Sequence, residues 1–269
     1  VCGAVHLAHP QLLAFLGQGN THLGGPYKIQ VRKGLRWLMG QQDARGAVGL
    51  AKDAGATTYS HALAAIVFCE AFSLTGDLQL ATPAENAIDA CLAMQTEDMG
   101  WKYGYDSGKS DSSVTGWMIQ AMSAARDAGA EVPRAAWAGA VAWFKSVTNS
   151  AGRTGYESRG GGSAFLKRSR GRFDALPVMT AACLLSNSEC GVRKRDPIFK
   201  KQIKVLQESL PSRTPKRVSY YYWYYGSYAL FRRGSNVFRR WNKALKQALL
   251  PSQNSMGCAK GSWEPAGEW

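Results

Sequence analysis

A run of aromatic residues is the most unusual feature of the sequence, and its residue types could support chemistry. Tyr220 to Tyr225 reads Tyr-Tyr-Tyr-Trp-Tyr-Tyr, and Tyr228 and Phe231 follow it. The π face of an aromatic ring attracts cations, whereas large rings also fill the gap between helices while their hydroxyls bond locally. We therefore expect this run either to line a cavity or to pack between helices. The residues that we expect to face such a cavity are Tyr221, Tyr222, Tyr225 and Tyr228.

His61 and Asp111 are the other residues whose chemistry and position stand out. His61 lies in an apolar segment beside Tyr59, where it could face a cavity, although such a histidine is more often a hydrogen-bonded core residue than a metal ligand. His6, His9 and His22 have no carboxylate or histidine partner at a metal-binding spacing. Asp111 stands directly before an apolar periodic segment, which is the position of a helix N-cap. We expect no metal site and no cofactor.

The positive charge is concentrated in the second part of the chain. Residues 1–150 hold 11 Lys and Arg against 12 Asp and Glu, whereas residues 151–269 hold 22 against 7. Such asymmetry suggests a phosphate, an anionic membrane or a nucleic acid as partner. A solvated basic face explains the same charge. Nucleic acid is the least favoured partner because the sequence contains no nucleic-acid-binding motif.

The six cysteines are scattered, without a CxxC pair. Cys69, Cys91 and Cys183 lie among apolar residues, where a free buried thiol is the usual interpretation. This usage favours a reduced, intracellular or membrane-peripheral setting over a disulfide-bonded one. The chain also lacks the long apolar run of a transmembrane helix.

Hydrophobic periodicity predicts about ten helices in five pairs and no strands. Val31, Leu35 and Leu38 form one apolar stripe on a basic helix, whereas the next helix, residues 59–74, is apolar nearly all round. The helix after Asp111 belongs with these apolar helices, and Val114, Trp117 and Met118, among other residues, recur in it at helical spacing. We therefore expect all-α architecture in which helices with a polar face alternate with buried ones.

The helix pairs recur at a regular period. Residues 34–42, 87–95 and 140–148 align with offsets of 53, and Pro83 and Pro133 open the second and third copies. A period of this size in an all-helical pattern indicates stacked helical hairpins. The spacing lengthens where residues 159–172 insert a basic, Gly-rich loop. A single domain over residues 1–269 accommodates the whole pattern.

The turns between these helices resemble the QW repeat of the terpenoid cyclase and protein prenyltransferase superfamily, and squalene–hopene-cyclase-like proteins in particular. Gln95 precedes Gly100-Trp101, Gln42 precedes Gly46, and Gln253 precedes Gly261-Ser262-Trp263. The resemblance implies an α/α toroid in which an inner and an outer ring of helices surround a central cavity. Because the chain starts with an inner helix and ends after an outer one, we expect it to be truncated at both ends and to self-associate at the open edge.

The same resemblance implies where chemistry would occur. In squalene–hopene cyclases an Asp-rich DXDD motif protonates an alkene, and Asp111 matches its last Asp, whereas Ser110 stands where the proton donor is expected. The DxC motif of the zinc-dependent prenyltransferases is absent from the sequence. Arg232, beside the aromatic run, is placed where prenyltransferases hold diphosphate. These departures favour a domain without catalysis.

Two functional readings follow. The first is a squalene-cyclase/prenyltransferase-like repeat domain that binds an apolar isoprenoid or lipid ligand, a peptide or a membrane surface. The second is an isoprenoid enzyme whose cavity is lined by the candidate residues. Asp111 is the one catalytic candidate. The candidates for ligand contact are His61, Tyr59, Trp117, Tyr221, Tyr222, Tyr225, Tyr228 and Arg232.

Overall fold

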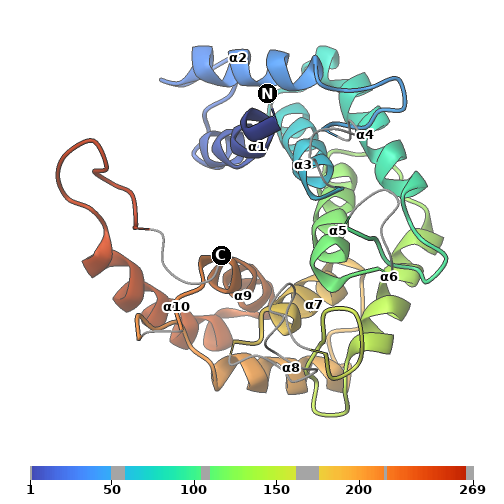
Figure 1. The fold of residues 1–269 in the computed structure, drawn as a ribbon, viewed down its shortest axis with the longest axis vertical. Helices are drawn as coiled ribbons and strands as arrows, with labels where there is room; N and C mark the ends of the chain where they lie inside the picture. Colours follow the sequence, from blue (N-terminus) through green and yellow to red (C-terminus); the bar gives the residue numbers. More distant parts are fainter. Residues whose placement is uncertain (1, 50–57, 104–109, 162–175, 215–216, 265–269) are drawn as a thin grey trace. The chain divides into compact units, whose positions relative to one another are not determined.

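The computed structural model describes residues 2–49, 58–103, 110–161, 176–214 and 217–264. Within these ranges the protein has ten α-helices, two short 3-10 helices and no strand, which confirms the predicted all-α class (Figure 1). Three isolated bridges between single residues are the only extended pairing in the described chain. The predicted basic loop, residues 159–172, lies mostly outside the described residues.

The described chain forms two compact units, Val1–Trp143 and Phe144–Trp269. The first contains α1 (Cys2–Gly17), α2 (Lys28–Met39), α3 (Thr58–Thr75), η1 (Leu78–Leu80), α4 (Ala81–Ala93), α5 (Ser112–Asp127) and most of α6 (Arg134–Val147). The second contains α7 (Val178–Glu189), α8 (Pro197–Gln207), α9 (Tyr220–Arg233), α10 (Ser235–Leu249) and η2 (Leu250–Ser252). The expectation of one domain over residues 1–269 stays a prediction.

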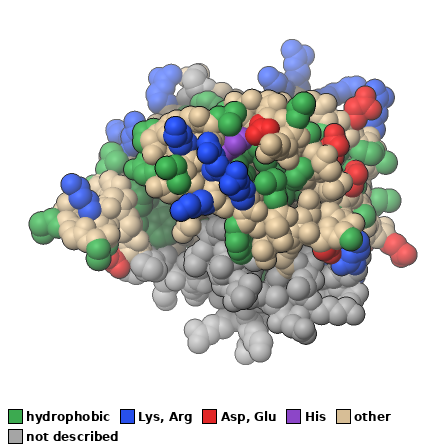
Figure 2. Space-filling view, turned by 90° about the horizontal axis from the view of Figure 1, so that it is seen from above, with side chains coloured by type: hydrophobic (Ala, Val, Ile, Leu, Met, Phe, Trp, Pro, Cys, Tyr) green, Lys and Arg blue, Asp and Glu red, His purple; other side chains and the backbone are tan. Residues whose placement is uncertain are grey.

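In the first unit, α3 is the central helix and packs against α1, α4 and α5 (Figure 1). Its residues from His61 to Cys69 are all buried. By contrast, α2 buries only one stripe, Val31, Leu35 and Leu38, and exposes its basic residues. The face of the molecule seen in Figure 2 carries a group of Lys and Arg side chains. The sequence therefore correctly separated helices buried all round from helices with a polar face.

In the second unit, α9 packs against α7 and α10. Gly226 lets α10 approach closely, since a Cβ at this position would lie 2.3 Å from the Trp241 ring. The Trp241 ring meets Tyr222 edge to face, with 5.3 Å between the ring centroids. The α8 and α10 helices expose a basic face, as α2 does. No helix in the described ranges is long and apolar enough to span a membrane.

The turns that follow α2, α4 and α6 share one hydrogen-bond pattern. The backbone N–H of Asp43 donates to the Ala47 carbonyl, that of Thr96 to the Gly100 carbonyl, and that of Asn149 to the Arg153 carbonyl. Donor and acceptor both move by 53 positions from one turn to the next. The predicted period therefore corresponds to a repeated local structure.

A glutamine side chain fastens two of these turns to the following helix pair. Gln42 Nε2 donates to the carbonyls of Gly46 and Pro83, each at 3.0 Å. Gln95 Nε2 donates to the carbonyls of Met99 and Ala136, at 3.0 and 3.2 Å. Both acceptors again shift by 53 positions. The glutamine thus closes its own turn and holds the first turns of the next polar-faced helix.

The same turns require a left-handed backbone at one position. Gly46 and Gly152 have φ of 80° and 86°, and Met99, at the equivalent position, has φ of 71°. Met99 is the one non-glycine residue with positive φ among the described residues. Glycine is required at position 46, because a Cβ there would lie 2.1 Å from the Asn86 carbonyl oxygen.

Candidate functional site

His61 is fully buried in α3 and both of its ring nitrogens are engaged. The backbone N–H of Val48 donates to Nδ1 at 3.1 Å, so the proton resides on Nε2, which donates to the Ala87 carbonyl at 3.0 Å. Burial lowers the pKa of His61 to about 4, although the Ala87 hydrogen bond and the charge of Asp43 act in the opposite direction. The structure therefore shows a neutral histidine whose hydrogen-bonding capacity is used by the fold.

The other two turns show what His61 does. The backbone N–H of Trp101 donates to Thr115 Oγ1, and that of Thr154 donates to Thr180 Oγ1, each at 3.0 Å. His61, Thr115 and Thr180 therefore occupy equivalent places, each accepting the N–H of the residue that ends a turn. The Sγ of Cys91 lies 3.4 Å from His61 Nε2, and burial raises the pKa of the Cys91 thiol. This pair therefore does not form an activated thiolate.

Asp111 caps α5, as the sequence predicted. Its side chain accepts the N–H of Val114 at 2.8 Å, and its own N–H donates to the Trp101 carbonyl at 2.9 Å. Only 2% of the residue is exposed. The carboxylate is thus positioned by the helix end and the turn that it joins, and its helix-capping role needs no substrate.

Asp98 is a carboxylate beside Ser110 that the sequence did not single out. Ser110 and Thr96 both donate their hydroxyl hydrogens to Asp98 Oδ1. Burial tends to raise the pKa of Asp98, but these hydrogen bonds and those from the backbone hold it below its ordinary value. The carboxyl group next to the position expected to carry a proton is therefore ionised at neutral pH, which is the opposite of what alkene protonation requires.

His22 has a carboxylate partner that its neighbours in sequence do not reveal. Its Nε2 lies 2.7 Å from Asp77 Oδ2, and Arg32 donates to the His22 carbonyl from Nη2 at 2.9 Å. The N–H of Gln79 and the His22 side chain together lower the pKa of Asp77. The pair joins the segment after α1 to η1. The other ring nitrogen, His22 Nδ1, is buried.

Several of the aromatic residues that were expected to line a cavity pack against other side chains. In the first unit Tyr59 of α3 and Trp117 of α5 pack with their ring centroids 5.5 Å apart. In the second unit Tyr222 and Tyr225 are completely buried. The Tyr222 hydroxyl donates to the Ser209 carbonyl at 2.9 Å, and burial raises the pKa of this phenol. Tyr222 therefore fills space between α9 and α10, which was the alternative interpretation of the aromatic run.

Four further aromatics of α9 lie on one face of the helix, which we call the α9 stripe. It consists of Tyr221, Tyr224, Tyr228 and Phe231, which follow one another at helical spacing. Tyr224 and Tyr228 have ring centroids 5.0 Å apart, and Tyr221 meets Tyr225 edge to face at 5.1 Å. Tyr228 is 52% and Phe231 67% exposed. The stripe therefore offers apolar area to a ligand at the surface of the second unit.

Arg232 forms an ion pair with Glu189. Its Nη2 lies 2.8 Å from Glu189 Oε1, and the Glu189 side chain is 4% exposed whereas that of Arg232 is 48% exposed. A buried carboxylate needs a charged or hydrogen-bonding partner, so the guanidinium has a structural task in joining α9 to α7. The predicted role of Arg232 in ligand binding stays a prediction.

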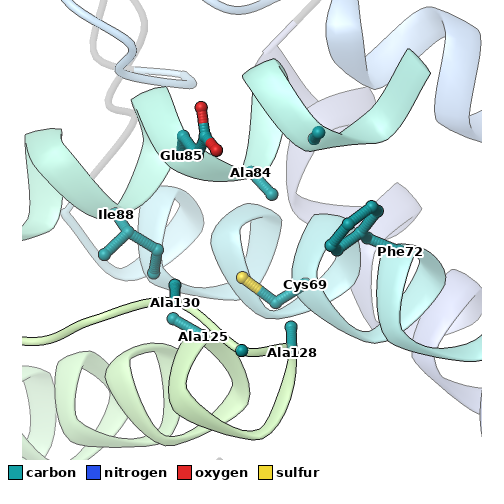
Figure 3. Close-up of a pocket in the computed structure, with 10 residues that line it drawn as sticks. Cys69, Phe72, Ala84, Glu85, Ile88, Ala125, Ala128 and Ala130 are labelled. Carbon is teal, nitrogen blue, oxygen red and sulfur yellow. The ribbon is translucent and has the colours of Figure 1, made fainter. Parts of the chain in front are cut away.

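An apolar pocket of about 120 Å³ lies in the first unit among α3, α4 and the end of α5 (Figure 3). Cys69, Phe72 and Ile88 line it with several alanines, and Glu85 lies on its α4 side. Burial raises the pKa of Cys69 to about 12, so this thiol is not a nucleophile at neutral pH. Pockets for ligands of drug size usually measure about 300–1,000 Å³. This pocket is therefore too small for an isoprenoid chain.

The described residues contain no group of three or more His, Cys, Asp or Glu that could hold a metal ion. No family model matches the chain, and no curated protein matches it. The structure therefore defines the class of protein: it is all-α, glutamine side chains bond two of its repeated turns to the next helix pair, and α9 carries an aromatic stripe with exposed rings.

Proposed function

We propose that this chain is a repeat domain of the terpenoid cyclase and protein prenyltransferase type that binds an elongated apolar ligand, such as an isoprenoid chain, without converting it. The α9 stripe carries the proposal, because Tyr228 and Phe231 are exposed on one helix face and Tyr221 and Tyr224, which are half-buried, continue the same face. Ten residues of helix separate Tyr221 from Phe231, which corresponds to about 15 Å along the axis. This length suits an extended hydrocarbon chain.

The repeated turns support the proposed architecture. The glutamine at positions 42 and 95, the left-handed position of the turn and the carbonyl acceptor on the next polar-faced helix recur with the 53-residue period. Gln42 and Gln95 are among the residues on which the resemblance to the QW repeat rests. The proposed arrangement is an α/α toroid with α1, α3, α5, α7 and α9 as inner helices and α2, α4, α6, α8 and α10 as outer helices.

The state of the acid–base candidates supports binding without catalysis. Asp111 caps α5, Asp98 is held ionised by hydroxyl groups, and His61 is neutral with both nitrogens bonded. An acid that protonates an alkene must instead hold its proton at neutral pH. A cavity that lacks such an acid can still bind an apolar chain through burial of aromatic surface.

Calorimetric titration of the protein with farnesol tests the proposed binding of an apolar chain. Tyr228→Ser with Phe231→Ser should weaken binding roughly tenfold or more, since each ring buries apolar area worth about 1–2 kcal/mol. Leu78→Ser is the matched control, because Leu78 is 79% exposed and lies on η1 in the other unit. Equal weakening by the control, or no binding of farnesol, would contradict the proposal.

Incubation with squalene and with allylic diphosphates, followed by mass spectrometry of the products, tests the absence of catalysis. We expect both substrates to be recovered unchanged. Product formation that disappears in Asp111→Asn would establish the alternative, an isoprenoid enzyme with Asp111 in its site. Binding of phosphatidylcholine vesicles in place of farnesol would instead assign the stripe to a membrane surface.

A further inference from the structure

A concave basic surface in the second unit is separate from the α9 stripe. It has a volume of about 610 Å³ and is lined by residues of α8, of the segment between α8 and α9, and of α10. Its three cations come from these three elements in turn: Lys204, Arg217 and Arg240. Its volume falls within the range of about 300–1,000 Å³ that is usual for small-molecule sites. We call it the basic concavity.

The charges that line the basic concavity are unbalanced. Glu208 is its single acidic lining residue, and its Oε1 lies 4.0 Å from Lys204 Nζ, with both side chains mostly exposed. A pair at this distance and exposure contributes little and leaves Lys204 able to reorient. Arg217 and Arg240 make no ion pair and no side-chain hydrogen bond within the described part of the chain. Two guanidinium groups are therefore available to a ligand.

Local structure explains why these cations meet. Trp241 is buried against Tyr222, which turns the preceding residue, Arg240, to the outer face of α10. After α8, the N–H of Thr214 donates to Ser212 Oγ, and the N–H of Arg217 donates to the Thr214 carbonyl. Arg217 lines the concavity together with Lys204 and Gln207 of α8. The cluster is thus built by packed elements and is more than a basic stretch of sequence.

We propose that the basic concavity binds a phosphate-bearing ligand with at least two negative charges, either a soluble polyphosphate or the headgroup of an anionic lipid. A guanidinium group donates two parallel N–H bonds to a phosphate, and Arg217 and Arg240 approach from different elements, so they can hold two oxygens or two phosphates. Ser212 and Gln207 add uncharged donors at the same surface. The excess of positive charge in residues 151–269 attracts such a ligand over a longer range.

Calorimetric titration with inorganic pyrophosphate at low ionic strength tests the site. The triple variant Lys204→Gln, Arg217→Gln, Arg240→Gln should lose binding by about thirtyfold to a hundredfold, as each cation contributes about threefold to fivefold at an exposed site. The matched control is Lys200→Gln, Arg195→Gln, Arg239→Gln, which removes the same charge from exposed neighbours that do not line the concavity. It should bind pyrophosphate within about twofold of the unchanged protein, because screening weakens distant charges.

Vesicles separate the two sources of phosphate. Sedimentation with phosphatidylcholine vesicles, with and without phosphatidylinositol phosphate, measures headgroup binding for the same three proteins. If the triple variant, but not the control variant, loses binding of pyrophosphate, the ligand is a soluble polyphosphate. If the triple variant alone loses binding of the phosphoinositide vesicles and pyrophosphate binding is not affected, the ligand is a lipid headgroup. Equal losses in the triple and control variants, or no binding of either probe, would overturn the proposal. Because farnesol binding is measured separately, a negative result for phosphate binding does not contradict the proposed role of the α9 stripe.

Discussion

The imidazole of His61 accepts a hydrogen bond from the backbone N–H of Val48, with 3.1 Å between the two nitrogens. Val48 ends the turn after α2, and His61 lies on the buried helix that follows. The same place is taken by Thr115 and Thr180 in the two later turns. The residue that first suggests ligand chemistry is therefore one of three side chains that fasten turns to the core.

This bond predicts a pH dependence of stability. Burial lowers the pKa of His61 from 6.5 to about 4, so the unfolded state takes up a proton between these values and the folded state does not. Stability from this group is therefore complete above pH 6.5 and is lost as the pH falls toward 4, by roughly 3 kcal/mol. Urea unfolding at a series of pH values measures it. His61→Gln keeps an acceptor and a donor without titrating, so the difference between the two proteins should shrink toward low pH.

The fastening glutamines give a second prediction. Gln42→Ala and Gln95→Ala each remove two hydrogen bonds to carbonyl groups and should lower the free energy of unfolding by about 1–2 kcal/mol. Gln41→Ala is the matched control, because Gln41 lies in the same turn and no hydrogen bond of its side chain is found in the described ranges. Denaturant unfolding would contradict the assigned role if the control were equally destabilised.

The left-handed position of the turns predicts that glycine and alanine at position 99 differ in stability. Met99 adopts φ of 71°, a conformation that costs an L-residue about 1–2 kcal/mol and glycine little. Met99→Gly and Met99→Ala both remove the side chain, so the glycine variant should be the more stable of the two by about 1 kcal/mol. Thermal unfolding of the pair measures this difference, and equal melting temperatures would argue against strain at this position.

Gly46→Ala should be far more harmful than a glycine replacement in open space. The new Cβ would lie 2.1 Å from the Asn86 carbonyl oxygen, so backbone must shift. Gly76 also has a positive φ, 64°, but a Cβ there meets no atom within 4 Å. We expect a loss of about 1 kcal/mol for Gly76→Ala, from the backbone conformation alone, and at least about 2 kcal/mol for Gly46→Ala.

Asp111 gives a prediction that distinguishes a cap from an acid. Because asparagine caps helices as well as aspartate does, Asp111→Asn should change the free energy of unfolding little, whereas Asp111→Ala should lower it by about 1 kcal/mol. Urea unfolding of both variants measures the ordering. A large loss in Asp111→Asn would show that the negative charge itself is needed.

Several features of the fold could be predicted because they depend on contacts close in sequence. Asp111 was recognised as the N-cap of α5, since the capping bond to Val114 spans three residues. The stripe of Val31, Leu35 and Leu38 correctly marked the buried side of α2. The 53-residue period was visible in the sequence because each turn needs the same few residue types. The all-α class follows from these local patterns.

The candidate site was less predictable, because its residues obtain their partners from distant parts of the chain. His22 meets Asp77, and Arg232 meets Glu189, across separations that periodicity does not encode. Helical spacing placed Tyr222 and Tyr228 on one helix, but only packing of α10 buried the first and left the second exposed.

The sequence by itself therefore determined where helices begin, which of their faces are apolar and how often the turns recur. Tertiary structure decided which polar groups form hydrogen bonds or ion pairs within the protein and which remain available to a ligand. His61, Asp111 and Arg232 are engaged because a buried polar group must find a partner. The α9 stripe keeps Tyr228 and Phe231 exposed, and the basic concavity is lined by the cations Lys204, Arg217 and Arg240.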